Sequence, residues 1–558
     1  MLYLAISFFA INRPILAEEE FFFLASENIL KSGIPLSLSG LASWHPPLYL
    51  YSLAAALKIF GPHIYSARLV GVFSFAVALF LIFKITQLIA KQESNQAYIL
   101  TAFMASLFYA SLPVVIRGSH ILDIDNTVLT VAFLLFTFFF LRFRGRGSFY
   151  KRELLSLGVL LSLVLLAKIT TTLALIFLII LYLALRKQFK DGFIIALAGI
   201  SCFLFFWFIY CHFSKINILG PFLHLRAQFQ SHAVGLQDGG SIIRELLNRL
   251  LRITAWLSLP FLFLAALISW EAIKSVWVSK VISERFFLVF LGLVIFCVYL
   301  FSGGVYYGFP RYQFPAVSLF VIALSLYCFE DVRKLHFEKG KMILFIGVIL
   351  FSILAFVFLV GDPVYSVNYK LKEALIYQNL NSKRVLMKIV MQIFVAQFLA
   401  FALFYFLLNL NKNRLSIYSK LKLSLIIQLF AASWALNIVQ MGAAHAVEYC
   451  YGERKTAELI AFLKSDVRFR DRQILAPNDI LYNVSSKHSE YRLDRFWNSP
   501  GEVLAELVKE DAGCLVYSVP HNTIAQFKNV FLNREIVSVL NARYKKIRIG
   551  TYELWIRL

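Results

Sequence analysis

The chain has 558 residues, of which 59% are hydrophobic and 16% are aromatic, and its mean hydropathy is +0.72. This composition excludes an ordinary soluble domain and indicates a protein that crosses a membrane many times. The formal charge of +23 is compatible with nucleic-acid binding. The basic residues lie in short loops between apolar segments, however, as the positive-inside rule for membrane proteins requires.

Apolar runs divide most of the chain into predicted membrane helices. A bilayer core about 30 Å thick needs roughly 20 apolar residues per helix, and the runs predict about thirteen helices. They cover residues 2–16, 67–90, 98–116, 126–141, 154–167, 172–185, 193–211, 255–270, 286–301, 314–329, 342–360, 385–410 and 423–441. The first run has no basic flank and no small-residue cleavage site, so we expect a retained helix rather than a signal peptide.

The loops between these helices predict the orientation of the chain. Alternate loops carry clusters of basic residues, which are Arg142, Arg144, Arg146, Lys151 and Arg152, then Arg186, Lys187 and Lys190, then Arg333, Lys334, Lys339 and Lys341, then Lys412, Arg414, Lys420 and Lys422. The short loops of the other set hold single cations, Arg117, Lys168 and Arg311. The rule then places the N-terminus in the cytoplasm and the C-terminus outside a plasma (inner) membrane, after an odd number of helices.

The first external loop, residues 17–66, opens with Glu18, Glu19 and Glu20. Two segments of this loop, 21–30 and 46–61, have the apolar period of helices that lie along a membrane surface. The acidic run has two interpretations. It is either a solvated start of a helix, or a carboxylate pair that faces a cavity and binds a cation or takes a proton from a hydroxyl group.

After about residue 441 the composition changes, and residues 442–558 predict a small extracytoplasmic α/β domain. Its expected helices are 456–465, 500–510 and 523–532, and its expected strands are 473–477, 513–520, 536–550 and 551–558. No phosphate-binding loop or Ser/His/Asp arrangement stands out in these residues, so we assign no chemistry to them.

The first external loop resembles that of the GT-C glycosyltransferases of the protein O-mannosyltransferase and lipid A aminoarabinose transferase type. The matching features are an acidic pair with an aromatic, a helix ending in glycine, a His-Pro-Pro-Leu-Tyr run, a helix ending Phe-Gly, and an Ala-Arg-Leu start of the next helix. In this sequence they are Glu18 and Glu19, Phe22, Gly33, His45–Tyr49, Phe60 and Gly61, and Ala67–Leu69. The acidic pair here is Glu-Glu rather than Asp-Glu, and His45 stands where lysine is commoner.

Further matches are Asp123 and Asp125 in HILDIDNTVLT, Lys168 in LLAKITTT and Arg311 in FPRYQFPAVSLF. The resemblance implies a GT-C fold in residues 1–441. It also implies inverting transfer of a sugar from a polyprenyl-phosphate carrier to a lipid (lipid A-like), polysaccharide or protein acceptor of the cell envelope, at the outer membrane face.

The resemblance also implies roles for these residues. Glu18 is the expected catalytic base, and Glu19 is expected to bind the sugar or a divalent metal ion. The resemblance implies transfer that is either metal-dependent or metal-independent, with no other cofactor. Asp125 and Asp123 are expected to bind the acceptor or the metal, and Lys168, Arg311 and His45 to lie at the donor phosphate, whose developing charge needs cations.

Simpler roles exist for each of these residues. Lys168 and Arg311 could reach lipid headgroups or pair with nearby acids, Asp123 and Asp125 could cap a helix, and His45 could be an interfacial residue before a rigid turn. Two other classes of protein also remain, a secondary transporter and a non-catalytic envelope-assembly subunit. A transporter is expected to show internal repeats, and none is evident in the sequence.

Overall fold

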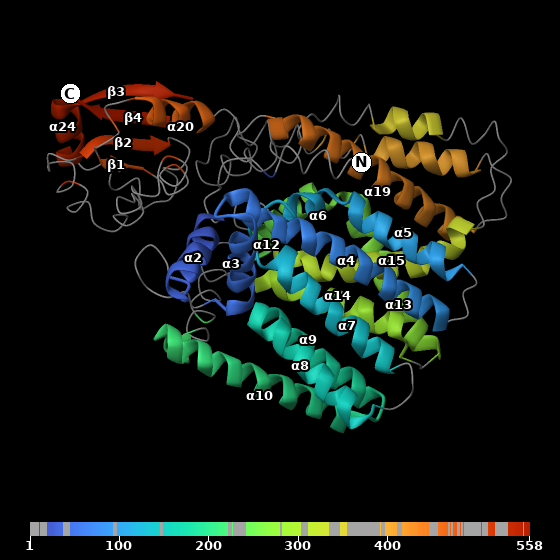
Figure 1. Ribbon diagram of the computed structural model, residues 1–558. Coiled ribbons are helices and arrows are strands. Elements are labelled where there is room, and N and C mark those ends of the chain that lie inside the picture. Colours follow the sequence, from blue (N-terminus) through green and yellow to red (C-terminus); the bar gives the residue numbers. More distant parts are fainter. Residues whose placement is uncertain are drawn as a thin grey trace.

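The structure is a computed structural model of the chain, and Figure 1 shows its course. It describes residues 11, 19–36, 45–92, 97–144, 149–220, 226, 242–279, 282–302, 311–333, 346–353, 391, 395, 397–409, 416–445, 456–466, 469, 473–476, 480, 484, 504, 512–518, 534–550 and 552–558.

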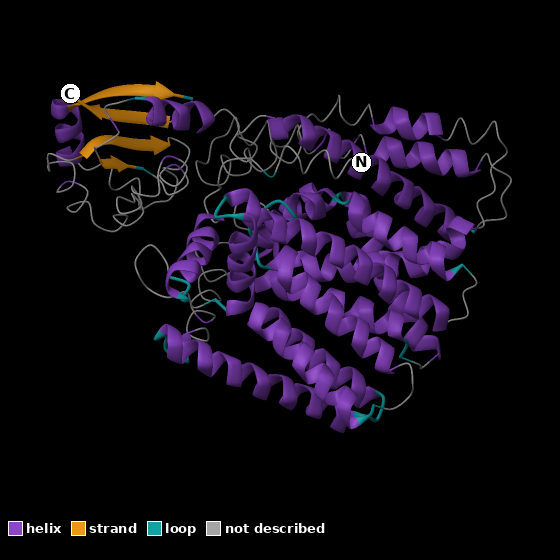
Figure 2. Cartoon of the chain, in the orientation of Figure 1, coloured by secondary structure: helices purple, strands orange, loops and turns teal. Residues whose placement is uncertain are grey.

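The described residues up to position 445 form a bundle of helices (Figure 2). The helices are α2 (Glu19–Ser32), α3 (Pro47–Phe60), α4 (Ile64–Gln92), α5 (Tyr98–Ser111), α6 (Pro113–Gly118), the π-helix η1 (Asp125–Leu129), α7 (Thr130–Arg144), α8 (Lys151–Ala167), α9 (Ile169–Leu185), α10 (Phe189–Ser214), α12 (Ile242–Leu257), α13 (Leu259–Ser279), α14 (Glu284–Ser302), the 3₁₀ turn η3 (Arg311–Gln313), α15 (Phe314–Arg333) and α19 (Ile417–His445).

Six of the described helical segments are long and apolar enough to cross a membrane. They are Ile64–Gln92, Asp125–Arg144, Phe189–Ser214, Leu259–Ser279, Glu284–Ser302 and Arg311–Cys328. Five of them coincide with predicted spans, and α8, α9 and α19 cover three more. The predicted span 255–270 is wrong in its bounds, because Ser258, at φ +68°, separates α12 from α13, and α13 continues to Ser279. Of the predicted span 2–16 the structure describes only residue 11, and of 342–360 only 346–353. Of 385–410 it describes 391, 395 and the helical residues 397–409, so the total of thirteen stays a prediction.

The predicted span 98–116 is wrong as one helix, because the structure breaks it into α5 and α6. Pro113 begins α6 and the preceding Leu112 has an extended backbone, φ −69° and ψ 124°. A proline lacks the N–H of a helix interior and disfavours helical geometry in the residue before it. The break turns the chain at the membrane surface and leads into the loop that carries Asp123.

The two helices expected in the first external loop are confirmed as α2 and α3. Gly33 follows α2 at φ +76°, a conformation that favours glycine, and Pro47 occupies the first turn of α3, where a missing N–H costs nothing. The inner face of α3 is buried, with Tyr49, Leu50 and Leu53 inaccessible to solvent. These helices are therefore packed against the bundle, and they hold the first loop in a fixed position.

Helix α10 lies at the outside of the bundle and packs closely on α8 (Figure 1). A Cβ atom on Gly158 would lie 2.5 Å from that of Ala198, so glycine permits the close approach. The opposite face of α10 carries exposed Phe205 and Phe208, as expected for a helix in contact with lipid.

The C-terminal residues form a four-stranded sheet with strand order β1-β2-β4-β3 (Figure 1). Its elements are α20 (Thr456–Ser465), β1 (Gln473–Leu475), β2 (Ala512–Ser518), α24 (Arg534–Arg543), β3 (Tyr544–Ile549) and β4 (Tyr552–Arg557). Strands β1 and β2 are parallel, and the other neighbours are antiparallel. The sheet packs on α20 through a core of its own that includes Leu459, Val516 and Leu554.

The expected strand 536–550 is only half correct. Its first half belongs to α24, which buries Ile536 and Leu540, four residues apart as on one face of a helix. The β-branched residues in this stretch suggested a strand, and the burial of one helix face outweighs that preference. The expected helices 500–510 and 523–532 lie almost entirely outside the described residues.

Candidate functional site

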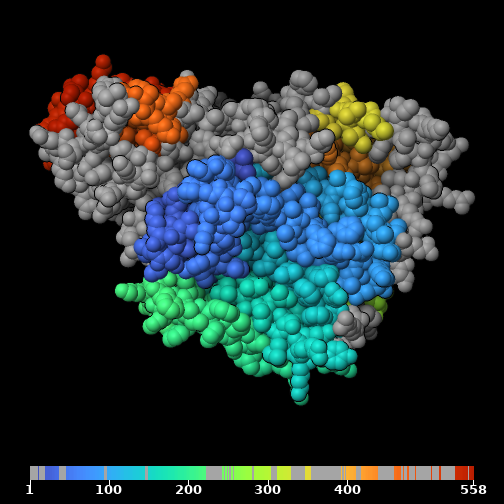
Figure 3. Space-filling view, viewed as in Figure 1, coloured from blue at the N-terminus to red at the C-terminus, as the bar shows by residue number. Residues whose placement is uncertain are grey.

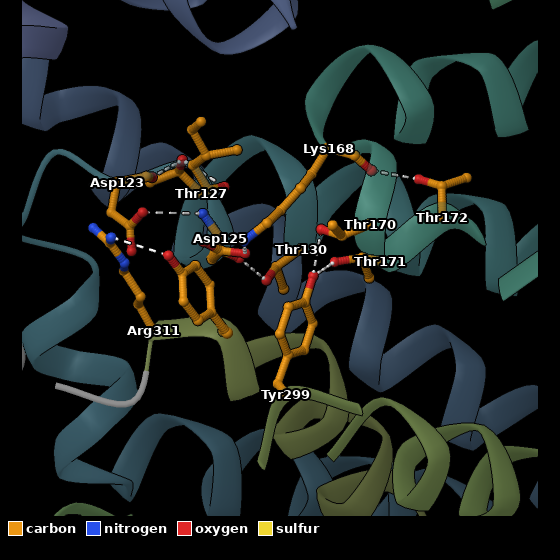
Figure 4. A network of polar contacts seen from close by, with 12 residues as sticks. Asp123, Asp125, Thr127, Thr130, Lys168, Thr170, Thr171, Thr172, Tyr299 and Arg311 are labelled. Atoms are coloured by element: carbon orange, nitrogen blue, oxygen red, sulfur yellow. Dashed lines mark hydrogen bonds and ion pairs between the residues drawn. The ribbon is translucent and has the colours of Figure 1, made fainter. Parts of the chain in front are cut away.

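Five segments that are distant in the sequence meet at one end of the helix bundle. They are the start of α2, the start of α4, the loop from Ser119 to η1, the α8–α9 junction and η3 with the adjacent end of α14. Polar and charged side chains from all of them form one buried network, part of which is drawn in Figure 4. Hydrophobic side chains surround this network on the bundle side, so its hydrogen bonds and ion pairs are formed away from water.

Glu19 is held at the first turn of α2 by a two-pronged ion pair. Arg68 donates from Nε to Oε1 at 3.2 Å and from Nη2 to Oε2 at 2.8 Å, and both side chains are almost inaccessible to solvent. The backbone N–H of Leu122 donates to Oε1 at 3.0 Å. Glu19 therefore joins the first external loop to α4 and to the residue that precedes Asp123.

Asp125 and Lys168 form a second ion pair, with 2.5 Å between Lys168 Nζ and Asp125 Oδ1. The ammonium group also lies 3.8 Å from the ring centre of Tyr312 and 5.2 Å from that of Tyr299, and the two rings are stacked. A cation over the face of an aromatic ring is attracted to it. One carboxylate and two tyrosines thus fix the charge of Lys168 in a defined position.

Tyr299 is itself anchored to the start of α9. Its hydroxyl oxygen lies 2.8 Å from Thr170 Oγ1 and 2.6 Å from Thr171 Oγ1 (Figure 4). The Thr172 hydroxyl donates to the carbonyl of Lys168 at 2.7 Å. The three consecutive threonines of the LLAKITTT run therefore position the lysine and its tyrosine partner.

Asp123 is buried in the loop before η1, and its Oδ2 has no hydrogen-bond partner among the described residues. Its Oδ1 accepts a long hydrogen bond, 3.5 Å, from the backbone N–H of Asp125. Burial raises the pKa of Asp123 to about 8, the nearby negative charge of Asp125 adds to the rise, and Lys168 opposes it. This is the carboxyl group of the network that is open to a further ligand.

The π-helix η1 orients these two aspartates. Thr127 has φ −115° and ψ −107°, outside helical geometry, and its hydroxyl donates to the Asp123 carbonyl at 2.6 Å. The Thr130 hydroxyl donates to the Asp125 carbonyl at 2.5 Å. π-Helical turns are rare and occur often at functional sites. Here the turn directs Asp125 toward Lys168, which a regular helix start would not do.

Arg311 and His45 lie beside this network. Arg311 Nη2 donates to the hydroxyl of Tyr312 at 3.1 Å, and in Figure 4 the guanidinium lies at the end of the network where Asp123 is drawn. The ring of His45 contacts Phe21 and Phe22, with centroid distances of 5.4 and 6.0 Å. Phe22 in turn meets Tyr49, so His45 packs against the helix that begins with Glu19.

Five of the predicted site residues thus come together, namely Glu19, Asp123, Asp125, Lys168 and Arg311. His45 lies against Phe21 and Phe22, and Glu18 and the side chain of Glu20 lie outside the described residues. The prediction missed the partners that hold them. Arg68 belongs to the matching Ala-Arg-Leu run, so a search for counter-charges near the acidic pair could have found it. Tyr312 directly follows Arg311, and its position next to that residue is its only signal in the sequence. Tyr299 carries no signal in the sequence.

No group of three or more His, Cys, Asp and Glu side chains suited to a metal ion occurs among the described residues. The Oδ2 of Asp123, which has no hydrogen-bond partner among the described residues, is a carboxylate oxygen of the kind that a divalent cation prefers.

Comparisons with known proteins agree with this architecture. Residues 44–210 match the family model of dolichyl-phosphate-mannose-protein mannosyltransferases, which covers less than a third of the chain. No curated protein matches the sequence.

Among solved structures, ArnT from Cupriavidus metallidurans bound to undecaprenyl phosphate matches with a TM-score of 0.58 at 13% identity, over 100% of this chain and 96% of that one. Its apo state gives 0.56 at 12% identity over the same shares of the two chains. The apo oligosaccharyltransferase of Archaeoglobus fulgidus gives 0.50 at 12% identity, over 100% of this chain and 74% of that one. These likenesses confirm the fold that the sequence predicts.

Proposed function

Since the chain has the GT-C fold of membrane glycosyltransferases and carries the dolichyl-phosphate-mannose-protein mannosyltransferase region over residues 44–210, we propose that it transfers a sugar from a polyprenyl-phosphate carrier. The acceptor is a lipid, polysaccharide or protein of the cell envelope, and the reaction inverts the configuration at the sugar carbon. ArnT, of the same fold, was solved with undecaprenyl phosphate bound, which supports a lipid phosphate as the leaving group here.

The observation that carries this proposal is the single network that joins Glu19, Asp123 and Asp125 to Lys168 and Arg311. The Leu122 N–H···Glu19 hydrogen bond and the Asp125–Lys168 ion pair connect its two halves. Buried charges in a membrane protein are costly to keep and mark functional sites. Carboxylates beside cations are also what transfer from a phosphate carrier requires.

Within this site the two glutamates have different tasks. Both oxygens of Glu19 are engaged by Arg68 and the Leu122 N–H, so its negative charge is neutralised and its position is fixed. We assign Glu19 to positioning the acidic segment and Glu18, the residue before it, to proton abstraction. A sugar- or metal-binding role for Glu19 requires the Arg68 contact to open, and that role stays a hypothesis.

The proposed transfer takes place in one step. Glu18 takes the proton of an acceptor hydroxyl, the hydroxyl oxygen forms a bond to the sugar carbon C1, and the bond from C1 to the phosphate oxygen breaks. The electron pair leaves with the polyprenyl phosphate. Lys168, Arg311 and the imidazole of His45 are the groups proposed to stabilise the added phosphate charge.

The aspartates have the complementary role of holding the acceptor or a cation. Asp123 offers a free Oδ2, and Asp125 shares its charge with Lys168. A divalent metal ion held by Asp123 would supply positive charge beside the phosphate; the remaining functions stay with the protein groups named above.

The structure supports the proposed orientation of this site toward the outer face. Helices α7, α9 and α15 all begin at the network. At their other ends, α7 and α15 finish at Arg144 and Arg333, and Arg186 directly follows α9. The basic ends therefore lie at the membrane face opposite to the network. By the positive-inside rule that face is cytoplasmic.

The test is transfer measured in membrane vesicles as release of polyprenyl phosphate from labelled polyprenyl-phosphate sugars. Glu18→Gln is expected to lower the rate by ~100-fold or more, because a missing general base typically costs 10²–10⁴-fold. Glu27→Gln, a glutamate within helix α2, is the matched control and is expected to keep the rate. Unchanged transfer in Glu18→Gln, Glu19→Gln and Glu20→Gln would remove the enzyme assignment and favour a non-catalytic assembly subunit.

A further inference from the structure

The break between α5 and α6 leaves the last carbonyl of α5 without its usual helical donor. In a continuous α-helix the N–H of Val115 would donate to the carbonyl of Ser111. Here Pro113 interrupts the helix, and the Val115 N–H donates to the Leu112 carbonyl at 3.0 Å instead. Ser111 is buried, so water does not readily replace that donor, and a buried carbonyl without a partner lowers stability.

Asn437 of α19 supplies the missing donor. Its side-chain Nδ2 donates to the Ser111 carbonyl at 2.8 Å, and Asn437 is inaccessible to solvent. Helix α19 packs against both α5 and α6, and Figure 3 shows orange atoms at the edge of the blue surface that α4 and α5 form. A hydrogen bond in such surroundings is stronger than one at a surface, because its groups are not in competition with water.

Helix α19 is itself held in place along its length. Lys422, near its start, forms an ion pair with Glu271 of α13, with 3.1 Å between Nζ and Oε1, and donates to the Tyr327 carbonyl of α15 at 3.4 Å. Phe430 stacks on Phe108 of α5, with 4.6 Å between the ring centres. The amide near the other end of α19 is therefore carried by a helix whose axial position is fixed.

The segment that follows the break leads into the candidate site. All six residues of α6, Pro113–Gly118, are buried, and in the loop after α6 the Leu122 N–H donates to Glu19 Oε1 at 3.0 Å, directly before Asp123. A short helix that is closely packed on all sides moves as one unit with the residues attached to its ends. The position of its start thus determines where the Leu122 N–H and the Asp123 carboxyl group lie.

We propose that Asn437 is a positioning residue for transfer, which acts by fixing the start of α6 and, through it, the loop that holds Glu19 and carries Asp123. Its effect on the transfer rate rests on the proposed function, whereas its effect on the loop depends only on the fold. Residue 437 lies outside the matched region 44–210. The proposal therefore gives α19 a part in the candidate site that the family match does not cover.

The direct test is amide hydrogen exchange of the detergent-solubilised full chain, measured by mass spectrometry. Asn437→Leu replaces the amide by an apolar side chain of similar size and leaves the Ser111 carbonyl unpaired. Exchange of residues 114–122 is expected to rise about 10-fold, the size expected when one buried hydrogen bond is lost. Exchange of α10, which does not pack on this part of the bundle, should stay as in the wild type. Wild-type exchange at residues 114–122, or an equal rise in α10, would overturn the proposal.

Ser433→Ala is the matched control. Ser433 lies one turn earlier on α19, is as inaccessible as Asn437, and its hydroxyl has no hydrogen-bond partner among the described residues. This variant is expected to exchange as the wild type does. A rise at residues 114–122 in it would show that any change in α19 loosens the loop, which contradicts a specific role of Asn437. Asn437→Ser, whose hydroxyl lies one bond closer to the backbone, tests the same contact if Asn437→Leu does not fold, and the same local rise is expected.

The transfer assay, run well below the melting temperature, tests the positioning role. In Asn437→Leu the kcat is expected to fall by roughly 10- to 100-fold, because a small misplacement far from the reacting atoms can have an effect of this size. The KM for the donor is expected to stay the same, since Lys168 and Arg311 lie on the α8–α9 junction and on η3 rather than on this loop. A rise in the donor KM with kcat unchanged, or an unchanged kcat together with a local rise in exchange, would contradict this role.

Hydrogen exchange needs no turnover, so its result stands apart from the transfer assay. A local rise in exchange in Asn437→Leu, with no transfer by the wild type, would remove the proposed reaction and keep the contact between α19 and α5. Transfer by the wild type without a local rise in exchange in the variant would do the reverse.

Discussion

The buried Glu19–Arg68 pair shows how one residue contact decides which carboxylate is available for chemistry. The two side chains are 1% and 0% exposed, so neither charge can be screened by water. Removal of one partner leaves the other buried and uncompensated, which typically costs 3–5 kcal/mol. Replacement of one partner alone is therefore expected to destabilise the protein more than replacement of both.

We expect Arg68→Met to destabilise the protein by about 3 kcal/mol or more, because it strands the Glu19 carboxylate. Arg68→Met combined with Glu19→Gln should recover a large part of that loss. Thermal unfolding in detergent checks both variants. If the double variant is as unstable as the sum of the two single variants, the ion pair does not have the role assigned to it.

Asp123 makes the free energy of unfolding depend on pH, and the direction of the change follows from its raised pKa. Burial raises its pKa from 3.8 to about 8, so between these pH values the folded protein holds a proton that the unfolded chain has lost. Its contribution to the free energy of unfolding therefore falls as the pH rises from about 4 to about 8. The stabilising form is the neutral one, present below that range.

Asp123→Asn removes this titration and keeps a side chain of similar shape. Relative to wild type, we expect the variant to gain stability between pH 5 and pH 8.5, by more than about 1 kcal/mol, since each unit of pKa shift corresponds to 1.36 kcal/mol. Melting temperatures at the two pH values, in buffer with a chelator, measure the gain. A difference that is constant or decreases with pH would show that Asp123 ionises normally in the fold.

At the scale of elements, close packing places the loop that carries Asp123. A Cβ atom on Gly71 of α4 would lie 2.2 Å from the carbonyl oxygen of Ser119, and a backbone atom cannot rotate away. Gly118, at the end of α6, similarly has no room beside the Phe314 ring, 2.3 Å from its Cβ position. Helix α4 and the α6–η1 loop therefore depend on glycine for their mutual position.

Gly71→Ala is expected to cost about 1–3 kcal/mol, as overpacking typically does, and to reduce transfer because the loop with Asp123 must shift. Gly347, which is also in a helix and has no atom within 4 Å of a Cβ position, is the control. Gly347→Ala should be neutral or slightly stabilising, because alanine favours helices. Melting temperature and transfer rate are measured for both. Wild-type values for Gly71→Ala would contradict the packing described.

Sequence patterns predicted most of these elements, because the length of an apolar run is enough to predict a membrane helix. The α5–α6 break was marked by Pro113 but was overlooked, since the apolar run continues through it. Helix α24 was missed because β-branched residues dominate a stretch whose helical state depends on tertiary burial.

The site was predicted only in part, for a related reason. Motif residues such as Asp125 and Lys168 could be named from the sequence, but their pairing depends on the π-helix η1 and on Tyr299, which no local pattern announces. The same holds for Glu19. Its motif predicts a functional role, and only the fold shows that Arg68 and the Leu122 N–H engage both of its oxygens.

At the scale of the whole molecule, the proposed topology has the network on the outer face of the membrane and the basic helix ends on the cytoplasmic face. Single cysteines in a variant without the six native ones can test this with a membrane-impermeant maleimide on intact cells. Leu219, 59% exposed after α10, is expected to be labelled as cysteine, and Tyr150, 64% exposed before α8, is expected to be protected until the membrane is opened. The reverse pattern would invert the topology and place the site on the cytoplasmic face.

The proposed function requires that the network at this end of the bundle binds a polyprenyl phosphate. A structure of the full chain with undecaprenyl phosphate bound tests it most directly. We predict that the phosphate lies within about 4 Å of Lys168 or Arg311, a distance at which ion pairs form. A phosphate bound at the opposite membrane face, or at this face but away from both cations, would contradict the proposed function.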